Sequence, residues 1–442
     1  MTSKDQLLQK QDTLSRRDFL KLSIWTFFVE EVLRRMPSLF QKAEGVKSPE
    51  RKLQPTIRVL DFFDLEKTKQ KFITSAFPPE FSEARAWKEM NVEDSSSPDN
   101  ILQAVPKNDD HVRLLMLTHF IQQRSKHGEQ VVSVLHAVSR FFHPRKAFEQ
   151  PSTLSISDAI TLGEVTYDEL GNPSLQVMVD AKKIHALVAK LSDSIINMSI
   201  QLGVFSLTYE LYKKQPKYPE LARKMPSTVT IGDKTTYKDY QGNEISEVEY
   251  QRILQLSEEF EIVTSEPNDR RVTFADGYAG KHTYSNYALL NAIAGFHPEK
   301  MFVVAGGNPT YQRGLQLPDI RKVRTWLKTQ GKLSENMIVV GFEGTESGFK
   351  APTSLGADVY VSTEDLKAFG FSPASSYATP VITEIIQSIV STGKATHAEI
   401  KAQLYQFTNE KSVWTGDEEI TYRVLDLNKV ERYLSLEQGK KE

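Results

Sequence analysis

The chain has 442 residues, enough for two or three domains of ordinary size or for one large domain with insertions. Hydrophobic residues make up 39% and charged residues 25%, which excludes a largely disordered chain. The 55 basic and 57 acidic residues give a formal net charge of −2, so we expect no nucleic-acid partner, and the absence of cysteine excludes disulfides, a thiolate nucleophile and cysteine-ligated metals.

Residues 1–45 are read as an N-terminal segment, separate from a main domain at 46–442. Ser15–Lys21 (SRRDFLK) resembles a twin-arginine export signal, which implies a periplasmic or secreted protein. The uncharged run that follows, Leu22–Val29, is short. The alternative is an amphipathic helix in a cytoplasmic protein, with an apolar face of Leu22, Trp25, Val29, Val32 and Met36. No uncharged apolar run reaches about 18 residues, so we expect no integral membrane span.

Short apolar runs and helical patterns alternate through the rest of the chain. Ile57–Leu60 predicts a first strand that ends at Asp61. Further short runs predict buried strands at Ile195-Ile196, Phe302–Val304, Ile338–Val340 and Val359–Val361. Residues 127–142 predict a helix with an inner face of Val131, Val134, Leu135, Val138 and Phe141. This alternation predicts an α/β fold with a mostly parallel central sheet and helices on both faces.

Three segments interrupt that rhythm, near residues 85–115, 163–180 and 205–280. The first contains a polar stretch at 91–110 that is typical of a surface loop. The second predicts a hairpin around Gly171-Asn172. The third is long, charged and rich in turn residues, and we expect it to be an inserted flap that restricts access to a site without supplying catalytic groups.

Four polar residues stand where the apolar elements begin or end: Asp61, His127, Asn308 and Ser376. Each has an ordinary explanation when taken alone, since Asp and Asn often end strands and Ser often caps a helix. The helix that Ser376 opens has a predicted inner face of Val381, Ile382, Ile385, Ile386, Ile389 and Val390. A serine at such a helix end also lies near free N–H groups that can bind an oxyanion. In this chain order the four residues match the acid, base, oxyanion amide and nucleophile of one serine peptidase arrangement.

The sequence around these positions resembles the motifs of the subtilisin-like (subtilase) serine peptidases. Ser376–Pro380 (SYATP) resembles the family's Ser-Met-Ala-Thr-Pro, and Ala305–Asn308 (AGGN) resembles its Ala-Ala-Gly-Asn. His127–Val132 (HGEQVV) resembles His-Gly-Thr-x-Val-Ala, and Ile195–Ile200 (IINMSI) resembles Val-Ile-Asn-Met-Ser-Leu. Ile57–Asp61 resembles the strand that ends at the family's aspartate. The resemblance covers roughly residues 55–405 and implies a subtilisin-like fold.

The resemblance also implies an activity: a serine endopeptidase that hydrolyses peptide bonds in protein or peptide substrates. Its catalytic groups would be Ser376 as nucleophile, His127 as base, Asp61 as the support of that base and Asn308 as oxyanion donor. An exposed edge that pairs with the extended substrate would be formed by Ser199, Ile200 and Gln201. The specificity pocket would be lined by Ala305, Gly306 and Gly307, whose small size predicts room for a large apolar side chain.

This chemistry needs no cofactor and no catalytic metal. Subtilases often bind structural calcium, but the sequence shows no loop with calcium-ligand spacing. The chain departs from the family pattern at Ala374-Ser375, just before the nucleophile, and at Phe62-Phe63, just after Asp61. These departures keep an alternative open, a catalytically inactive subtilase-like fold that acts as a peptide-binding or scaffolding module.

Overall fold

The structure is a computed structural model. It describes residues 53–63, 65–95, 104, 106–124, 126–144, 148–167, 173–200, 202–209, 227–231, 234–238, 244–248, 272–275, 279–308, 319–346, 349–393, 396–414 and 419–439. The signal-like Ser15–Lys21, the expected turn at Gly171-Asn172 and much of 205–280 lie outside these residues. In the part of the chain that is described, no helix combines the length and the apolar character needed to cross a membrane.

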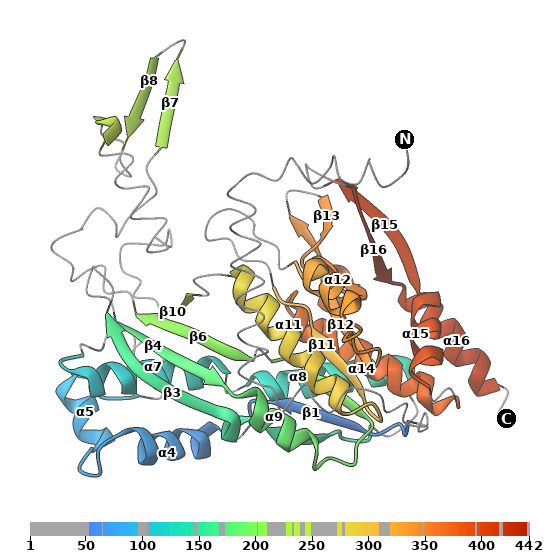
Figure 1. Ribbon diagram of the computed structural model, residues 1–442, viewed down its shortest axis with the longest axis horizontal. Helices are drawn as coiled ribbons and strands as arrows, with labels where there is room; N and C mark the ends of the chain where they lie inside the picture. The colour runs from blue at the N-terminus through green and yellow to red at the C-terminus, as the bar shows by residue number, and fades with distance from the viewer. Residues whose placement is uncertain are drawn as a thin grey trace. The chain divides into compact units, whose positions relative to one another are not determined.

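A nine-stranded sheet forms the centre of the fold, in the order β15-β16-β14-β12-β11-β5-β1-β2, with β13 paired to β12 outside this path (Figure 1). Its strands are β1 (Ile57–Asp61), β2 (Ser152–Ser155), β5 (Ile195–Met198), β11 (Met301–Ala305), β12 (Met337–Glu346), β13 (Phe349–Pro352), β14 (Val359–Ser362), β15 (Thr408–Trp414) and β16 (Glu419–Leu425). All neighbours from β16 to β2 run parallel, whereas β13 and β15 pair antiparallel. The predicted mostly parallel α/β sheet is confirmed.

The central strands are buried on both faces, which explains why their sequences are short continuous apolar runs. Val303 of β11 belongs to a cluster packed under helix α14 (Ser375–Ser391). Because side chains alternate along a strand, its neighbours Phe302 and Val304 face the other way. Both are buried there, on the side where helix α11 (Ala279–Phe296) contacts β11. Helices therefore cover both faces of the sheet.

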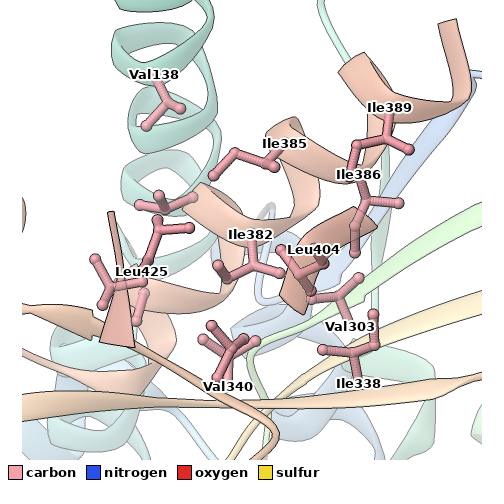
Figure 2. Packing of buried hydrophobic residues seen from close by; sticks show 14 of the residues in the cluster. Val138, Val303, Ile338, Val340, Ile382, Ile385, Ile386, Ile389, Leu404 and Leu425 are labelled. Atoms are coloured by element: carbon pink, nitrogen blue, oxygen red, sulfur yellow. The ribbon is translucent and has the colours of Figure 1, made fainter. Parts of the chain in front are cut away.

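Helix α14 lies at the centre of the apolar cluster that contains Val303. Ile382, Ile385 and Ile386 are fully buried, as the helical spacing predicted. In Figure 2, Ile382 and Ile386 lie toward the strand residues Val340 and Val303, whereas Ile385 extends toward Val138. On its other side α14 packs against α8 (His127–Phe142). The helix that begins at the proposed nucleophile is thus held by the core itself.

The remaining described elements are further helices and two smaller sheets. Among the described residues, the other α-helices are α4 (Leu65–Ala76), α5 (Glu83–Glu89), α7 (Asp109–Arg124), α9 (Ala181–Val188), α12 (Arg321–Thr329), α13 (Thr363–Ala368), α15 (His397–Gln406) and α16 (Leu427–Gly439), together with the 3-10 turn η2 (Ser157–Ala159). A second, antiparallel sheet has the order β10-β6-β4-β3, and a third has the order β7-β8-β9. Their strands are β3 (Ile160–Tyr167), β4 (Pro173–Val179), β6 (Gly203–Tyr209), β7 (Ser227–Ile231), β8 (Lys234–Lys238), β9 (Glu244–Ile245) and β10 (Val272–Ala275).

The second sheet explains two of the three interrupting segments. β3 and β4 pair antiparallel, as expected for a hairpin at 163–180. β6 and β10, which bracket most of the 205–280 segment, pair with each other from Tyr209↔Val272 to Ser206↔Ala275. The long segment therefore leaves and re-enters the fold at adjacent strands, which is what an insertion requires.

One residue of the predicted core was placed wrongly. Phe141 is 47% exposed, and its neighbour Phe142 is buried instead. The two rings touch edge to face, and Phe141 also contacts Phe369 at the surface. The apolar face of α8 has drifted by one residue at its last turn, because seven helical residues fall about 20° short of two full turns and the a/d spacing does not hold to the end of the helix.

Candidate active site

The first half of the site is an aspartate–histidine pair. Because β1, β5 and β11 are parallel, their carboxyl ends lie at the same edge of the sheet, and Asp61 is the last residue of β1. His127 begins α8, and its Nδ1 lies 2.8 Å and 2.9 Å from the two carboxylate oxygens of Asp61. Asp61 is fully buried, whereas the His127 side chain is 13% exposed. With Nδ1 held as a donor, Nε2 is the nitrogen left to accept a proton.

Gly128 explains how the helix and the strand come so close. A Cβ atom there would lie 2.6 Å from the backbone oxygen of Phe62 and 2.7 Å from the ring of Phe63. The residue after the histidine must therefore lack a side chain for α8 to begin against the turn that follows β1. Asp61 Oδ1 also accepts a 2.7 Å hydrogen bond from the Phe62 N–H, which fixes the carboxylate in that turn.

The second half of the site is the start of α14, where two adjacent serines differ sharply. Ser375 is buried, and both its N–H and its hydroxyl donate to Asn308 Oδ1, at 2.8 Å and 3.0 Å. Its backbone oxygen accepts from the Thr379 hydroxyl at 2.7 Å. Ser376 is half-buried, and among the described residues its hydroxyl has no hydrogen-bond partner. Of the two serines, only Ser376 has a hydroxyl that is not already engaged.

Asn308 is positioned by the turn that ends β11. Its side-chain oxygen is occupied by Ser375, and its amide nitrogen has no partner among the described residues. Gly307 just before it has a φ of +94°, a conformation in which residues with a side chain are strained. The glycine thus turns the chain so that Asn308 reaches the first turn of α14 with its amide N–H2 group unpaired.

The structure gives Gly306 a different explanation from the one expected. A Cβ on Gly306 would lie 3.0 Å from Ser354 Oγ and 3.1 Å from Val340 O. The space over this glycine is therefore filled by the protein, and the missing side chain permits close packing of β11 against its neighbours. At Gly306 the expected roomy pocket wall is not supported, while Ala305 and Gly307 are each partly buried beside it.

The structure describes the expected substrate edge only in part, and backbone pairing with a peptide stays a prediction. Ser199 and Ile200 have buried side chains, and Gln201 lies outside the described residues. The Ser199 hydroxyl donates to the backbone oxygen of Ser376 at 3.1 Å and lies 3.3 Å from Asn197 Oδ1. The Ser199 hydroxyl therefore connects the segment that follows β5 to the first turn of α14.

Two residues that the sequence analysis did not single out join the two halves. The ring of Tyr377 stacks on that of His127, with centroids 5.9 Å apart and planes inclined by 28°. Its hydroxyl donates to Gln130 Oε1 at 2.6 Å. Burial raises the pKa of Tyr377, and the negative charge of Asp61 raises it further, whereas Arg124 lowers it. The only sequence signal for this contact was an aromatic residue directly after the proposed nucleophile.

The structure thus pairs Asp61 with His127 and Asn308 with Ser375, and it connects the two pairs through Tyr377. Within the described residues no hydrogen bond joins His127 to Ser376. In unliganded enzymes such catalytic hydrogen bonds are often long and tighten only when substrate binds. Among the same residues no group of three or more His, Asp and Glu could hold a metal ion, so we assign no calcium site.

Comparison of the sequence with protein-family models and with curated proteins gives no match. Among solved structures, the chain is similar to the nisin leader peptidase NisP from Lactococcus lactis, with 10% sequence identity and a TM-score of 0.30. The match covers 89% of this chain and 90% of that one. At this TM-score it adds nothing to what the residues of the chain show.

Proposed function

We propose that the chain is a subtilisin-like serine endopeptidase that cleaves peptide bonds in protein or peptide substrates. The observation that carries the proposal is the pairing of the buried Asp61 with His127. This pair lies at the same edge of the sheet as Asn308, whose side-chain oxygen accepts hydrogen bonds from Ser375, the residue before Ser376. An acid–base pair, an unpaired amide and an unengaged serine hydroxyl are the parts that acyl transfer requires.

In the proposed reaction His127 Nε2 takes the proton of the Ser376 hydroxyl as its oxygen attacks the carbonyl carbon of the scissile bond. Asp61 keeps the proton on Nδ1 and stabilises the imidazolium that forms. The imidazolium then gives its proton to the leaving amine, and the acyl group remains on Ser376. Water, deprotonated by His127, releases the acyl group in the second half of the cycle.

The oxyanion of the tetrahedral intermediate would be bound by two donors. One is the amide nitrogen of Asn308, and the other is the N–H of Ser376, which belongs to the first turn of α14. N–H groups in the first turn have no acceptor within their own helix, and the helix end adds a partial positive charge. Losing one such donor typically costs about 10² to 10³ in turnover, a magnitude known from subtilisin itself.

The test is covalent labelling with a fluorophosphonate, which reacts with an activated serine. We expect labelling of the wild type at Ser376 and none in Ser376→Ala. Ser375→Ala should still be labelled, more slowly, because Asn308 loses a hydrogen bond. Ser391→Ala, on the exposed last turn of the same helix, serves as the matched control and should be labelled at the wild-type rate.

Two outcomes would contradict the proposal. Labelling that persists in Ser376→Ala and disappears in Ser375→Ala would move the nucleophile to the buried serine. A folded wild-type protein that is never labelled would instead favour the inactive peptide-binding module. In that case binding of an extended peptide, measured by calorimetry, would be unchanged in Ser376→Ala.

A further inference from the structure

Tyr377 connects the proposed nucleophile to the helix that carries the proposed base. It follows Ser376 directly in the chain. Its ring stacks on His127, and its hydroxyl donates to Gln130 Oε1 at 2.6 Å. His127 and Gln130 are three residues apart in the first turn of α8. The Tyr377 side chain therefore contacts this turn at two points, His127 through its ring and Gln130 through its hydroxyl.

The contact with the ring constrains His127 in a way that Asp61 alone does not. The Asp61 carboxylate holds the imidazole through Nδ1, which fixes that nitrogen but leaves the ring able to tilt about the hydrogen bonds. A second ring stacked on one face restricts this tilt. The position of Nε2, which must meet the Ser376 hydroxyl, depends on both contacts together.

We propose that Tyr377 is a positioning residue that orients the His127 imidazole relative to Ser376, with Gln130 as the anchor of its hydroxyl. The inference rests on the proposed function. Tyr377 is itself supported from another side, since the ring of Phe371 lies 5.8 Å from its own. The ring is half-buried, and its two contacts with α8 and one with Phe371 leave it little freedom.

The stack also has an electrostatic consequence. The face of an aromatic ring attracts a cation, so Tyr377 favours the imidazolium that His127 becomes during the reaction. The other charged groups around the pair are Asp61 from β1 and Arg124 from the end of α7, which both act on Tyr377. Glu129 in the first turn of α8 points to solvent. Removing the ring should therefore remove this stabilisation of the imidazolium and also loosen the orientation of the His127 ring.

The first experiment measures the second-order rate of fluorophosphonate labelling at Ser376. Tyr377→Phe keeps the ring and loses the hydroxyl bond, and Gln130→Ala loses the same bond from the other end. Each should be labelled about 5-fold more slowly, the size expected for one hydrogen bond. The double variant should be no slower than either alone, because both changes remove one interaction. Tyr377→Leu, which loses the ring as well as the hydroxyl, should be labelled more slowly than either single variant, about 10-fold or more below the wild-type rate.

The matched control is Tyr433→Phe on α16. Its hydroxyl makes a comparable 2.9 Å hydrogen bond with Thr392 Oγ1, away from the site, so this variant should be labelled at the wild-type rate. Rates for Tyr377→Phe and Gln130→Ala that equal the wild-type rate would overturn the inference. A double variant in which the two reductions in labelling rate multiply would also overturn the inference.

The second experiment separates this inference from the proposed function. The ring-proton resonances of His127 are followed by NMR, which requires no activity. Protons that lie over the face of an aromatic ring are shielded, so Tyr377→Leu should move these resonances downfield, and Tyr377→Phe, which keeps the ring, should leave them near those of the wild type. Unchanged His127 resonances in Tyr377→Leu would contradict the inference. If the wild type is not labelled at all, the proposed function fails, and the resonances still decide whether the Tyr377 ring orients His127.

Discussion

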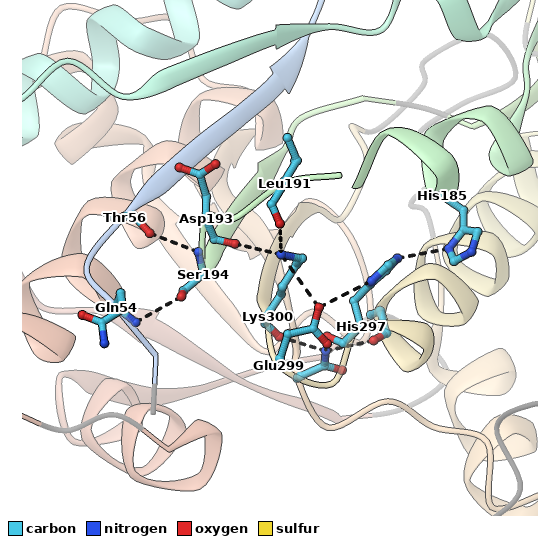
Figure 3. Close-up of polar contacts among 11 residues, drawn as sticks. Gln54, Thr56, His185, Leu191, Asp193, Ser194, His297, Glu299 and Lys300 are labelled. Carbon is cyan, nitrogen blue, oxygen red and sulfur yellow. Dashed lines mark hydrogen bonds and ion pairs between the residues drawn. The ribbon is translucent and has the colours of Figure 1, made fainter. Parts of the chain in front are cut away.

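The two ends of the central sheet each carry a histidine in a polar cluster, and the two clusters differ in what they leave unpaired. At the carboxyl ends of the strands His127 pairs with Asp61. At the amino ends, His297 Nε2 lies 3.1 Å from Nδ1 of His185, as Figure 3 shows. Both histidines at the amino end are hydrogen-bonded, with His297 buried and His185 partly buried, so residue type alone does not separate a chemical role from a structural one.

The amino-end cluster is internally satisfied. Lys300 Nζ donates to the backbone oxygens of Leu191 and Asp193, at 2.7 Å and 3.1 Å (Figure 3). The Asn336 amide donates to three more backbone oxygens at 2.9 Å. These bonds fix the turns that lead into β5 and β11. The cluster has the properties of a structural brace, in which buried donors and acceptors are matched.

The carboxyl-end cluster retains hydrogen-bonding capacity. Within the described residues, the Ser376 hydroxyl and the Asn308 amide nitrogen have no hydrogen-bond partner. Both lie next to Ser375, whose N–H and hydroxyl are hydrogen-bonded to Asn308 Oδ1. Unpaired groups next to rigidly held ones are what a substrate would complete. This difference in saturation, more than the presence of a histidine, marks the carboxyl end as the candidate site.

The largest expected effect tests the role of the Asp61–His127 pair. Asp61→Asn keeps an acceptor for the Phe62 N–H but removes the charge that holds Nδ1 protonated. Labelling of Ser376 should fall by about 10⁴-fold, the loss that such a change causes in a Ser–His–Asp triad. The rate should be normalised to the folded fraction, measured by circular dichroism. His297→Gln, at the other end, should keep the wild-type rate; a similar loss there would erase the contrast between the two ends.

The next effect concerns the brace. Asn336→Leu removes the side-chain hydrogen bonds to the backbone oxygens of Ala294, His297 and Lys300, of which the first two still accept from the N–H groups of His297 and Lys300. The free energy of unfolding in urea should fall by about 1–3 kcal/mol, the usual cost of leaving a buried polar group without its partner. The labelling rate of the folded protein should not change. A loss of labelling without a loss of stability would show that the amino end takes part in the chemistry.

Gly128→Ala tests the tight start of α8. The new methyl group would collide with Phe62 O and the Phe63 ring, so the helix must shift. We expect a loss of about 1–3 kcal/mol in unfolding free energy, typical of overpacking, together with slower labelling because His127 moves with the helix. Ser133→Ala, on the exposed side of the same helix, is the control and should change neither quantity. Labelling of Gly128→Ala at the wild-type rate would mean that the Asp61–His127 pair still works when the start of α8 is displaced.

The smallest effect is a pH dependence of stability at the amino end. Burial lowers the pKa of both His185 and His297, and for His297 the carboxylate of Glu299 opposes the shift while His185 adds to it. A lowered pKa means that the folded state binds fewer protons than the unfolded state. Stability is therefore full above the unfolded pKa of about 6.5 and declines as the pH falls below it. Urea unfolding at pH 7.5 and 5.5 should show this decline, and His185→Leu should reduce it.

The strands and the two central helices could be predicted from the sequence because burial on both faces leaves continuous apolar runs. Ile195-Ile196, Phe302–Val304 and Ile338–Val340 are all strand residues, and α14 has its predicted inner face. The second sheet could not be assembled in the same way. β6 and β10 pair across more than 60 residues of intervening chain, from Tyr209 to Val272, and nothing local in either strand specifies the partner.

In the candidate site, too, features with a local sequence signal could be predicted, and features that depend on distant segments could not. Asp61, His127, Asn308 and the helix start at Ser375-Ser376 could be found from motifs, because each stands at the end of an element. The burial of Ser199 and the packing over Gly306 could not, since both depend on which side chains arrive from distant segments. The Tyr377–Gln130 bond was missed for that reason, as its partners are 247 positions apart.

The position of α14 late in the chain has a consequence for biosynthesis. This helix covers strand residues such as Val303 and Val340, and it supplies Ser375, which anchors Asn308. A nascent chain that has not yet reached residue 375 must leave that apolar surface exposed, and it also lacks the proposed nucleophile. Because long-range contacts form late in folding, burial of the core and assembly of the candidate site coincide. Under the proposed function, an immature chain lacks the means to cleave its neighbours, and its exposed apolar surface is prone to aggregation until the helix has been made.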